Sequence, residues 1–372
     1  MAVAAHKPSP KIKAPAPQHE HTVLVLQGGG ALGAFQAGAF EGMAAAGAMP
    51  DWVSGVSIGA INAALIAGNP PQRRVERLRE FWQGVSAGLP FVAPSGLDPM
   101  RPVLNRMAAA SATLFGIPGF FAPRGLHPSA LGLYDTAPLR ATLLELVDFD
   151  LINDKKVRLS VGAVNVRTGN SVYFDNHKTR IGPEHVMASG ALPPGFPPVQ
   201  IGEDCFWDGG IVSNSPLWYV LDEVPNINAL IVQIDLFSAR GAMPQNLDQV
   251  QERAKDIQYS SKTRFNTNQL REREELKASF RRLLAKLPAQ LRNDADVKRL
   301  EAASQSSAIS LVHLINRHDT GSQSVKDYEF SRATVNDLWS AGLNDVRHCV
   351  RHIDWANATE QHEGMRVFDL AR

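Results

Sequence analysis

Cysteine, excess charge of one sign and metal-binding patterns are scarce in this 372-residue chain. Its two cysteines, Cys205 and Cys349, lie far apart and outside any Cys-x-x-Cys spacing, which excludes a disulfide framework and a thiolate metal site. Thirty-eight basic residues against 37 acidic ones leave a formal charge of +1, so there is no overall basic footprint for nucleic acid. We therefore expect a cytoplasmic protein without a metal, a cofactor or a nucleic-acid partner.

A hydrophobic run long enough to cross a membrane is also missing. The most apolar stretch, residues 53–68, has 16 residues including two serines and one asparagine, whereas a spanning helix needs about 20 apolar residues. This stretch is typical of a buried helix. Residues 1–21 are rich in Pro, Ala and Lys and lack the apolar core of a signal peptide, so we expect a disordered tail there.

Short apolar runs that end in glycine alternate with helical segments of small residues, which is the pattern of a parallel α/β sheet. This pattern and the β-branched runs predict helices at 34–46 and 60–67, and strands at 23–26, 52–54, 158–166, 171–174, 229–235 and 309–315. The expected fold is a three-layer α/β/α architecture with a mainly parallel central sheet, followed by a largely helical C-terminal extension.

Composition divides the chain further. Residues 88–138 are rich in Pro, Gly, Phe and Met and predict loops or short helices, which either form a lid or wall over an apolar cleft or simply pack on the core. From about residue 244, Gln, Arg, Glu and Lys dominate. The predicted units are a tail at 1–21, a main domain at 22–238 and a mostly helical extension at 244–372.

A Gly-x-Ser-x-Gly motif formed by Gly55, Ser57 and Gly59 lies between a predicted strand and a predicted helix. Flanking glycines are needed there because a nucleophile elbow forces the serine into a strained backbone conformation. The same pattern recurs around Ser86, where it follows a charged helical run and no strand precedes it. We interpret Ser86 as a chance match and Ser57 as the candidate nucleophile.

A glycine loop follows the first predicted strand and opens the first predicted helix. Backbone N–H groups at such a helix start bind either a phosphate or an oxyanion, and the loop residues are Gly28, Gly29, Gly30, Ala31, Leu32 and Gly33. The loop also fits a dinucleotide fingerprint, with Asp51 about twenty residues on as the ribose-binding acid. The serine elbow that follows so soon favours the oxyanion role.

The third motif is an aspartate followed by two glycines, Asp208, Gly209 and Gly210, with Asn214 and Pro216 just beyond. This composition suits a carboxylate that a tight turn exposes to a cleft. Taken alone, the motif fits an Asp-Gly hairpin turn equally well.

Together these three motifs, in this order and at similar separations, resemble the patatin-like phospholipase family over residues 22–238. The segment that starts at Lys326 is similar to a C-terminal extension of some bacterial members. The resemblance implies that Ser57 is the nucleophile, that Asp208 is its dyad partner and that the amides of residues 28–33 form an oxyanion hole. Where the family often has Arg or Lys, this chain has Leu32, which puts a head-group role of that side chain in doubt.

The implied activity is that of a serine acyl hydrolase, a phospholipase A or related lipid ester hydrolase, acting through an acyl-enzyme without a histidine. One alternative is a Ser-His-Asp triad, for which His313 or His318 beside the strand at 309–315 is the best histidine. The other is a dinucleotide-binding oxidoreductase that uses the glycine loop.

Residues 262–300 contain eleven basic and five acidic residues. An apolar stripe at helical spacing accompanies them and consists of Leu276, Phe280, Leu283, Leu284 and Leu287. Such a helix either docks on an anionic membrane surface or, as is more common, packs its stripe on its own domain. Peripheral membrane contact therefore stands beside the lipid or acyl-ester substrate as an expected partner, and the sequence carries no signal of an oligomeric state.

Overall fold

The computed structural model describes residues 19–86, 101–125, 130–223, 228–261, 263–305, 308–318, 325–352 and 364–369. Of the predicted N-terminal tail, residues 1–18 lie outside this described part. Of the segment 88–138, residues 88–100 and 126–129 lie outside it as well.

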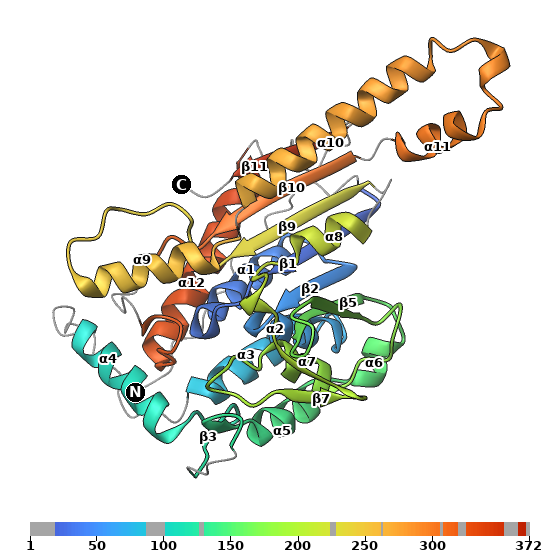
Figure 1. Ribbon diagram of the computed structural model, residues 1–372. Helices are drawn as coiled ribbons and strands as arrows, with labels where there is room; N and C mark the ends of the chain where they lie inside the picture. The colour runs from blue at the N-terminus through green and yellow to red at the C-terminus, as the bar shows by residue number, and fades with distance from the viewer. Residues whose placement is uncertain are drawn as a thin grey trace.

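Nine strands of the described chain form one sheet, in the order β11-β10-β9-β1-β2-β5-β8-β7 with β6 also beside β5 (Figure 1). The strands are β1 His21–Leu26, β2 Trp52–Val56, β5 Arg158–Asn165, β6 Ser171–Asp175, β7 Val199–Ile201, β8 Asp204–Asp208, β9 Ala229–Asp235, β10 Ala308–Ile315 and β11 Gly364–Asp369. Neighbours from β11 to β5 are parallel, whereas β6, β7 and β8 pair in antiparallel fashion. A separate antiparallel pair consists of β3 Ala122–Pro123 and β4 Tyr134–Asp135.

Helices cover both faces of this sheet. They are α1 Gly33–Ala45, α2 Ile58–Ala67, α3 Arg74–Ser86, α4 Arg101–Phe115, α5 Ala137–Leu146, α6 Phe149–Asn153, α7 Pro183–Ser189, α8 Leu217–Glu223, α9 Leu247–Tyr259, α10 Thr263–Leu284, α11 Ala295–Ala303 and α12 Arg332–Val350. Short 3₁₀ turns are η1 Gly30–Leu32, η3 Gly209–Ile211 and η4 Ala289–Leu291.

The central strand β1 is buried on both faces because successive side chains of a strand point to opposite sides. Leu24 and Leu26 belong to the larger core, together with side chains of α1, α2, α3 and α12. Val23 and Val25 belong to a smaller core on the other face, together with side chains of α8. The predicted three-layer α/β/α fold with a mainly parallel sheet is therefore confirmed.

The C-terminal residues contribute to the same sheet and to the same core. Strands β10 and β11 extend the sheet beyond β9, and α12 packs closely against α1. A Cβ atom on Gly38 of α1 would lie 1.9 Å from the carbonyl oxygen of Trp339 in α12, so glycine is what permits this approach. The division into a domain at 22–238 and an extension at 244–372 remains a prediction.

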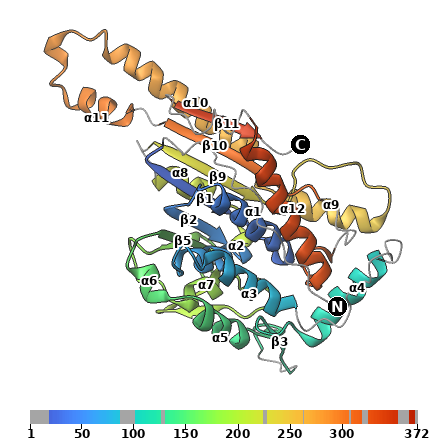
Figure 2. The same ribbon diagram turned by 180° about the vertical axis from the view of Figure 1, so that it is seen from behind.

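Helices α10 and α11 project beyond the sheet, as Figures 1 and 2 show from opposite sides. The predicted apolar stripe of α10 is half-buried or exposed, with Leu276 54% and Leu283 55% exposed. The more common arrangement, in which the stripe is buried on its own domain, is therefore wrong for these two side chains.

All six predicted strands and both predicted helices occur, with bounds that differ by two residues at most. The apolar stretch at 53–68 forms β2 and the fully buried α2, as expected. Segment 88–138 differs from its prediction because α4 is a regular helix of 15 residues. Within the described ranges, no helix is both long and apolar enough to cross a membrane.

Replacement of Gly38 by alanine should lower the free energy of unfolding by about 1–3 kcal/mol, because the new methyl group forces α1 and α12 apart. Urea denaturation measures this change. Gly84→Ala in α3 is the matched control, since nothing lies within 4 Å of the added Cβ atom; it should raise stability by about 0.5–1 kcal/mol. Equal stability of the two variants would contradict the α1–α12 packing.

Candidate active site

Ser57 lies between β2 and α2 in a backbone conformation that side chains rarely adopt, with φ 57° and ψ −125°. The two flanking glycines make this turn possible. A Cβ atom on Gly55 would lie 2.2 Å from the Gly59 carbonyl oxygen, and one on Gly59 would lie 2.4 Å from the carbonyl oxygen of Leu26. Strain of this kind occurs where the surrounding structure holds a residue for function. The predicted elbow is present at Ser57.

Ser189, at the end of α7, holds the backbone at this turn. Its hydroxyl oxygen accepts a hydrogen bond from the Ser57 N–H group at 3.0 Å and donates one to the Gly162 carbonyl of β5 at 2.5 Å. The sequence analysis missed Ser189, because nothing in its local sequence indicates that α7 ends beside the serine turn.

Asp208 is the last residue of β8 and is followed directly by the 3₁₀ turn η3, so the alternative of a hairpin turn is wrong. Its side chain is only 2% exposed. The carboxylate accepts a hydrogen bond from the Gly210 N–H group at 2.7 Å, and it lines the same end of the cavity as Ser57. Burial raises the pKa of Asp208 to about 7, against the interactions with Ser57 and Gly210, which lower it.

The six amides of the glycine loop differ in what they can still bind. Four of them already donate to carbonyl oxygens, in the pairs Gly28 to Asn214, Ala31 to Asp327, Leu32 to Gly29 and Gly33 to Gly30. The N–H groups of Gly29 and Gly30 have no acceptor among the described residues. An incoming oxyanion would therefore find its donors at these two glycines rather than along the whole of residues 28–33.

Leu32 packs into the larger core and does not line the cavity described below. This position therefore presents no charged group to a substrate.

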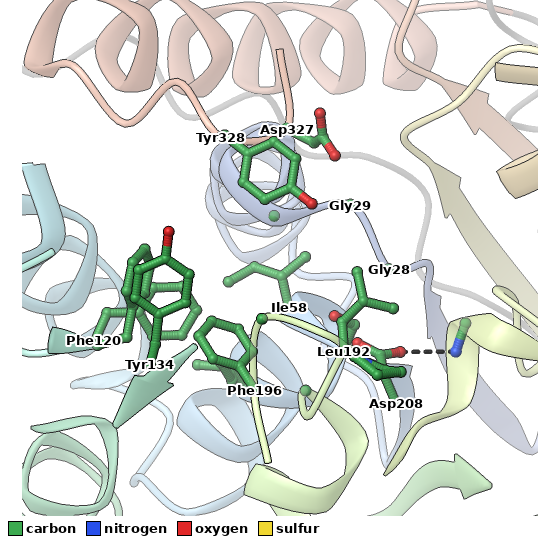
Figure 3. A pocket seen from close by; sticks show the side chains of 18 of the residues that line it. Gly28, Gly29, Ile58, Phe120, Tyr134, Leu192, Phe196, Asp208, Asp327 and Tyr328 are labelled. Carbon is green, nitrogen blue, oxygen red and sulfur yellow. Dashed lines mark hydrogen bonds between the residues drawn. The ribbon is translucent and has the colours of Figure 1, made fainter. Parts of the chain in front are cut away.

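A cavity of about 390 Å³ opens at Ser57, Asp208 and the glycine loop. Gly28, Gly29, Ser57 and Asp208 line one end, and Figure 3 shows aromatic side chains gathered at the other. Ring centroids in this aromatic group lie 4.7–6.3 Å apart, and its members are Phe120, Phe121, Tyr134, Phe196 and Phe330. Pockets of this size with apolar walls and few polar groups are typical of small-molecule sites.

Segment 88–138 supplies a large part of this wall, through Ala112, Thr113, Phe120, Phe121 and Leu133–Tyr134. Of the two roles considered for the segment, its described residues thus fit that of a cleft wall.

The histidines considered for a triad lie elsewhere. His313 is buried with its Nε2 atom 3.3 Å from an oxygen of Asp235, and His318 Nε2 lies 3.0 Å from Asp345. No histidine of the described chain lines the cavity.

The remaining sequence candidates are also separated from Ser57. Asp51 contacts the Thr22 N–H group at the start of β1, at the opposite end of that strand from the glycine loop, which argues against a ribose-binding role. Ser86 ends α3, and its hydroxyl donates to the Trp82 carbonyl at 2.7 Å.

Asn214 connects the third motif to the glycine loop. Its side-chain amide donates to the Gly28 carbonyl at 3.1 Å and to the Tyr259 carbonyl at 2.9 Å. A Cβ atom on Gly28 would lie 2.4 Å from the Asn214 side-chain oxygen, so a glycine is required there.

Comparison with known proteins identifies the family. A family model described as patatin-like phospholipase matches residues 24–221, and a second, described as patatin phospholipase, matches residues 257–362. The first match spans more than half of the chain. The protein therefore belongs to the patatin-like phospholipase family, as the three motifs predicted.

Individual relatives are distant. A cGAMP-activated phospholipase of Pseudomonas aeruginosa is 31% identical over 118 residues, which cover 28% of this chain and 35% of the relative. The match thus spans about a third of the length of that curated relative. Among solved structures, human GIVD cytosolic phospholipase A2 has a TM-score of 0.39 at 12% identity and covers 93% and 61% of the two chains. VipD of Legionella pneumophila has a TM-score of 0.32 at 14% identity and covers 92% and 72%.

Asp208→Asn should stabilise the protein increasingly as the pH rises. The folded-state pKa of about 7 exceeds the ordinary value of 3.8, so the folded state binds the proton more tightly, and the wild type loses stability between about pH 4 and pH 7. Asparagine does not titrate and can still accept the Gly210 hydrogen bond. The gain in free energy of unfolding should be small at pH 4 and reach up to about 4 kcal/mol at pH 8, since one pKa unit equals about 1.4 kcal/mol.

Urea denaturation at both pH values measures the effect. Asp204→Asn, on the same strand but in a half-exposed ion pair with Arg167, is the control and should show no comparable growth with pH. A gain for Asp208→Asn that is the same at pH 4 and pH 8 would contradict the raised pKa.

Proposed function

We propose that this protein is a serine acyl hydrolase that cleaves lipid acyl esters, with Ser57 as nucleophile and Asp208 as base. The observation that carries the proposal is that a strained serine and a buried carboxylate lie together at the end of an apolar cavity. Membership of the patatin-like phospholipase family supports the same activity. The absence of a described histidine from the cavity lining favours the dyad over a triad.

In the first step, the Ser57 oxygen attacks the acyl carbonyl carbon while its proton passes to Asp208. The negative charge on the carbonyl oxygen is stabilised by the N–H groups of Gly29 and Gly30, and each such donor contributes about 10²- to 10³-fold in rate. Asp208 then returns the proton to the leaving alcohol, and an acyl-enzyme remains. Water attacks this ester in the same way, gives its proton to Asp208 and releases the carboxylic acid as Ser57 is reprotonated.

The raised pKa suits Asp208 to this role. An aspartate with the ordinary pKa of 3.8 holds a proton too weakly to take one from a hydroxyl group. Burial raises the pKa of Asp208 to about 7, so the group is substantially ionised at neutral pH and still a much stronger base.

The substrate portion that the cavity fits is an acyl chain. The wall of the cavity far from Ser57 is built from Phe120, Phe121, Tyr134 and Phe196, which offer an extended apolar surface but no charged group. A hydrocarbon chain can therefore extend from the Ser57 end toward these rings with its surface removed from water.

We propose that the protein acts in the cytoplasm and contacts lipid surfaces through a mouth patch, which consists of Leu114, Phe115, Leu131 and Leu133. Both cysteines are free thiols, which supports a reducing compartment. Leu114 and Phe115 are 67% and 76% exposed and directly follow cavity-lining residues of α4. Exposed apolar side chains that adjoin cavity-lining residues in the chain would, if they border the entrance, let a lipid pass from a membrane to the site without crossing water.

A fluorophosphonate probe should label Ser57, and Ser57→Ala should lose both the label and hydrolysis of acyl esters by at least about 10³-fold, since the acyl-enzyme cannot form. Site mapping by mass spectrometry and a panel of phospholipid, monoacylglycerol and thioester substrates measure this. Ser86→Ala is the matched control and should be labelled and active like the wild type.

Two further variants test the base. His313→Ala and His318→Ala should retain most of the activity of the wild type, provided that thermal melting confirms that they fold. A folded histidine variant without activity would establish a triad instead, and label at Ser86 would overturn the assignment of Ser57.

Exchange of both Leu114 and Phe115 for aspartate should abolish flotation with liposomes that contain phosphatidylglycerol, because charged groups in the mouth patch cannot enter the interface. The matched control replaces Leu276 and Leu283 of α10, which are similarly exposed but do not adjoin the cavity. Loss of flotation in the α10 variant alone would assign membrane contact to α10.

A further inference from the structure

Residues 325–328 bring the C-terminal part of the chain to the glycine loop. They form a turn closed by a hydrogen bond from the Tyr328 N–H group to the Val325 carbonyl at 2.9 Å. The carbonyl oxygen of Asp327 accepts the Ala31 N–H group at 2.9 Å. The contact is so close that a Cβ atom on Gly30, which has φ +55°, would lie 2.1 Å from that oxygen. The carbonyl group of Asp327 thus contacts the loop at both Gly30 and Ala31.

The side chain of Asp327 anchors this turn to α9. Its carboxylate lies 2.7 Å from the ammonium group of Lys255, and it is 13% exposed. The neighbouring Lys326 makes the reverse contacts, at 3.2 Å to Glu252 and 2.6 Å to Asp256. The acidic and basic residues of α9 lie three and four positions apart and therefore on one face of the helix. The turn therefore packs on α9 through three ion pairs. In one of them the acidic residue belongs to the turn, and in the other two it belongs to α9.

Helix α9 is in turn attached to the active-site motifs. The carbonyl group of its last residue, Tyr259, accepts hydrogen bonds from Gln27 and from Asn214, both at 2.9 Å. Gln27 directly precedes the glycine loop. The glycine loop is therefore held where it leaves β1 and again at Ala31, which contacts residues 325–328. Helix α9 contacts both of these holding segments.

The same turn also completes the cavity. Asp327 and Tyr328 both line it, and in Figure 3 the ring of Tyr328 extends toward the glycine loop while the Asp327 carboxylate points away from it. The carboxylate is thus positioned to contact Lys255 rather than a substrate.

We infer that Asp327 is a positioning residue for the oxyanion donors: its carbonyl group, fixed by the ion pair with Lys255, holds Ala31 so that the N–H groups of Gly29 and Gly30 face the cavity. This inference rests on the proposed function. It assigns to the C-terminal part of the chain a direct contribution to the active site, in which Asp327 acts through the loop and touches no reacting atom.

Asp327→Asn retains the shape of the side chain and removes its charge. We expect kcat for a short-chain ester to fall roughly 10- to 100-fold with KM nearly unchanged, because small displacements of catalytic donors cost rates of this order. The rate of fluorophosphonate labelling at Ser57 should fall in parallel. Asp150→Asn, which removes one partner of the exposed ion pair with Arg180, is the matched control and should leave both rates unchanged.

Lys255 provides the second test, which does not alter residues 325–328. Lys255→Ala should lower kcat as Asp327→Asn does, and Lys255→Arg should restore most of the loss since it retains the charge. If Asp327→Asn does not fold, the two Lys255 variants decide alone.

The outcomes separate the two levels of the proposal. A wild-type protein that is not labelled at Ser57 would refute the proposed function itself. Labelling of Ser57 at the wild-type rate in Asp327→Asn or Lys255→Ala would refute only the positioning role. Equal kcat for Lys255→Ala and Lys255→Arg would show that the charge of residue 255 is not what holds the turn.

Discussion

The carboxylate of Asp208 is removed from water at the end of β8, and much of the surrounding structure is arranged to permit it. A buried charge is costly unless hydrogen bonds compensate for the lost solvent. Here the Gly210 N–H group supplies one such bond, and the nearby Ser57 hydroxyl also favours the charged carboxylate. The close approach of η3, directly after Asp208, to β5 depends on Gly209, where a Cβ atom would lie 2.6 Å from the Gly162 carbonyl oxygen. The stability that the fold gives up at this one residue is what turns a weak base into a useful one.

A second constraint is the strained turn at Ser57. Three separate parts of the chain contact it or its neighbours: Ser189 holds its N–H group, β1 limits the space at Gly59, and Asn214 and Gly28 interlock beside it. None of these contacts is strong alone. Because they act at one point, together they hold the strained conformation of the serine.

The sequence alone predicted strands that contain continuous apolar runs, such as residues 23–26 of β1 and 229–232 of β9, and the three glycine motifs, because burial and steric closeness leave local traces. It did not predict β7, β8 or β11, which are short or carry mixed residues, so pairing with a neighbour rather than composition defines them. Among functional candidates, Ser57 and Asp208 were found from their glycines. Ser189 and Asp327 were missed, because their roles depend on contacts with residues 132 and 296 positions away, respectively, in the chain.

The contact between Gly30 and Asp327 has a consequence for the order in which the molecule is made. The glycine loop leaves the ribosome almost three hundred residues before the carbonyl group that contacts it. Strand β10, which completes the pairing of β9, also comes from that later part. A growing chain would thus carry Ser57 and Asp208 before the loop is fixed beside them, and on the proposed mechanism hydrolysis would begin only once that later part has been made.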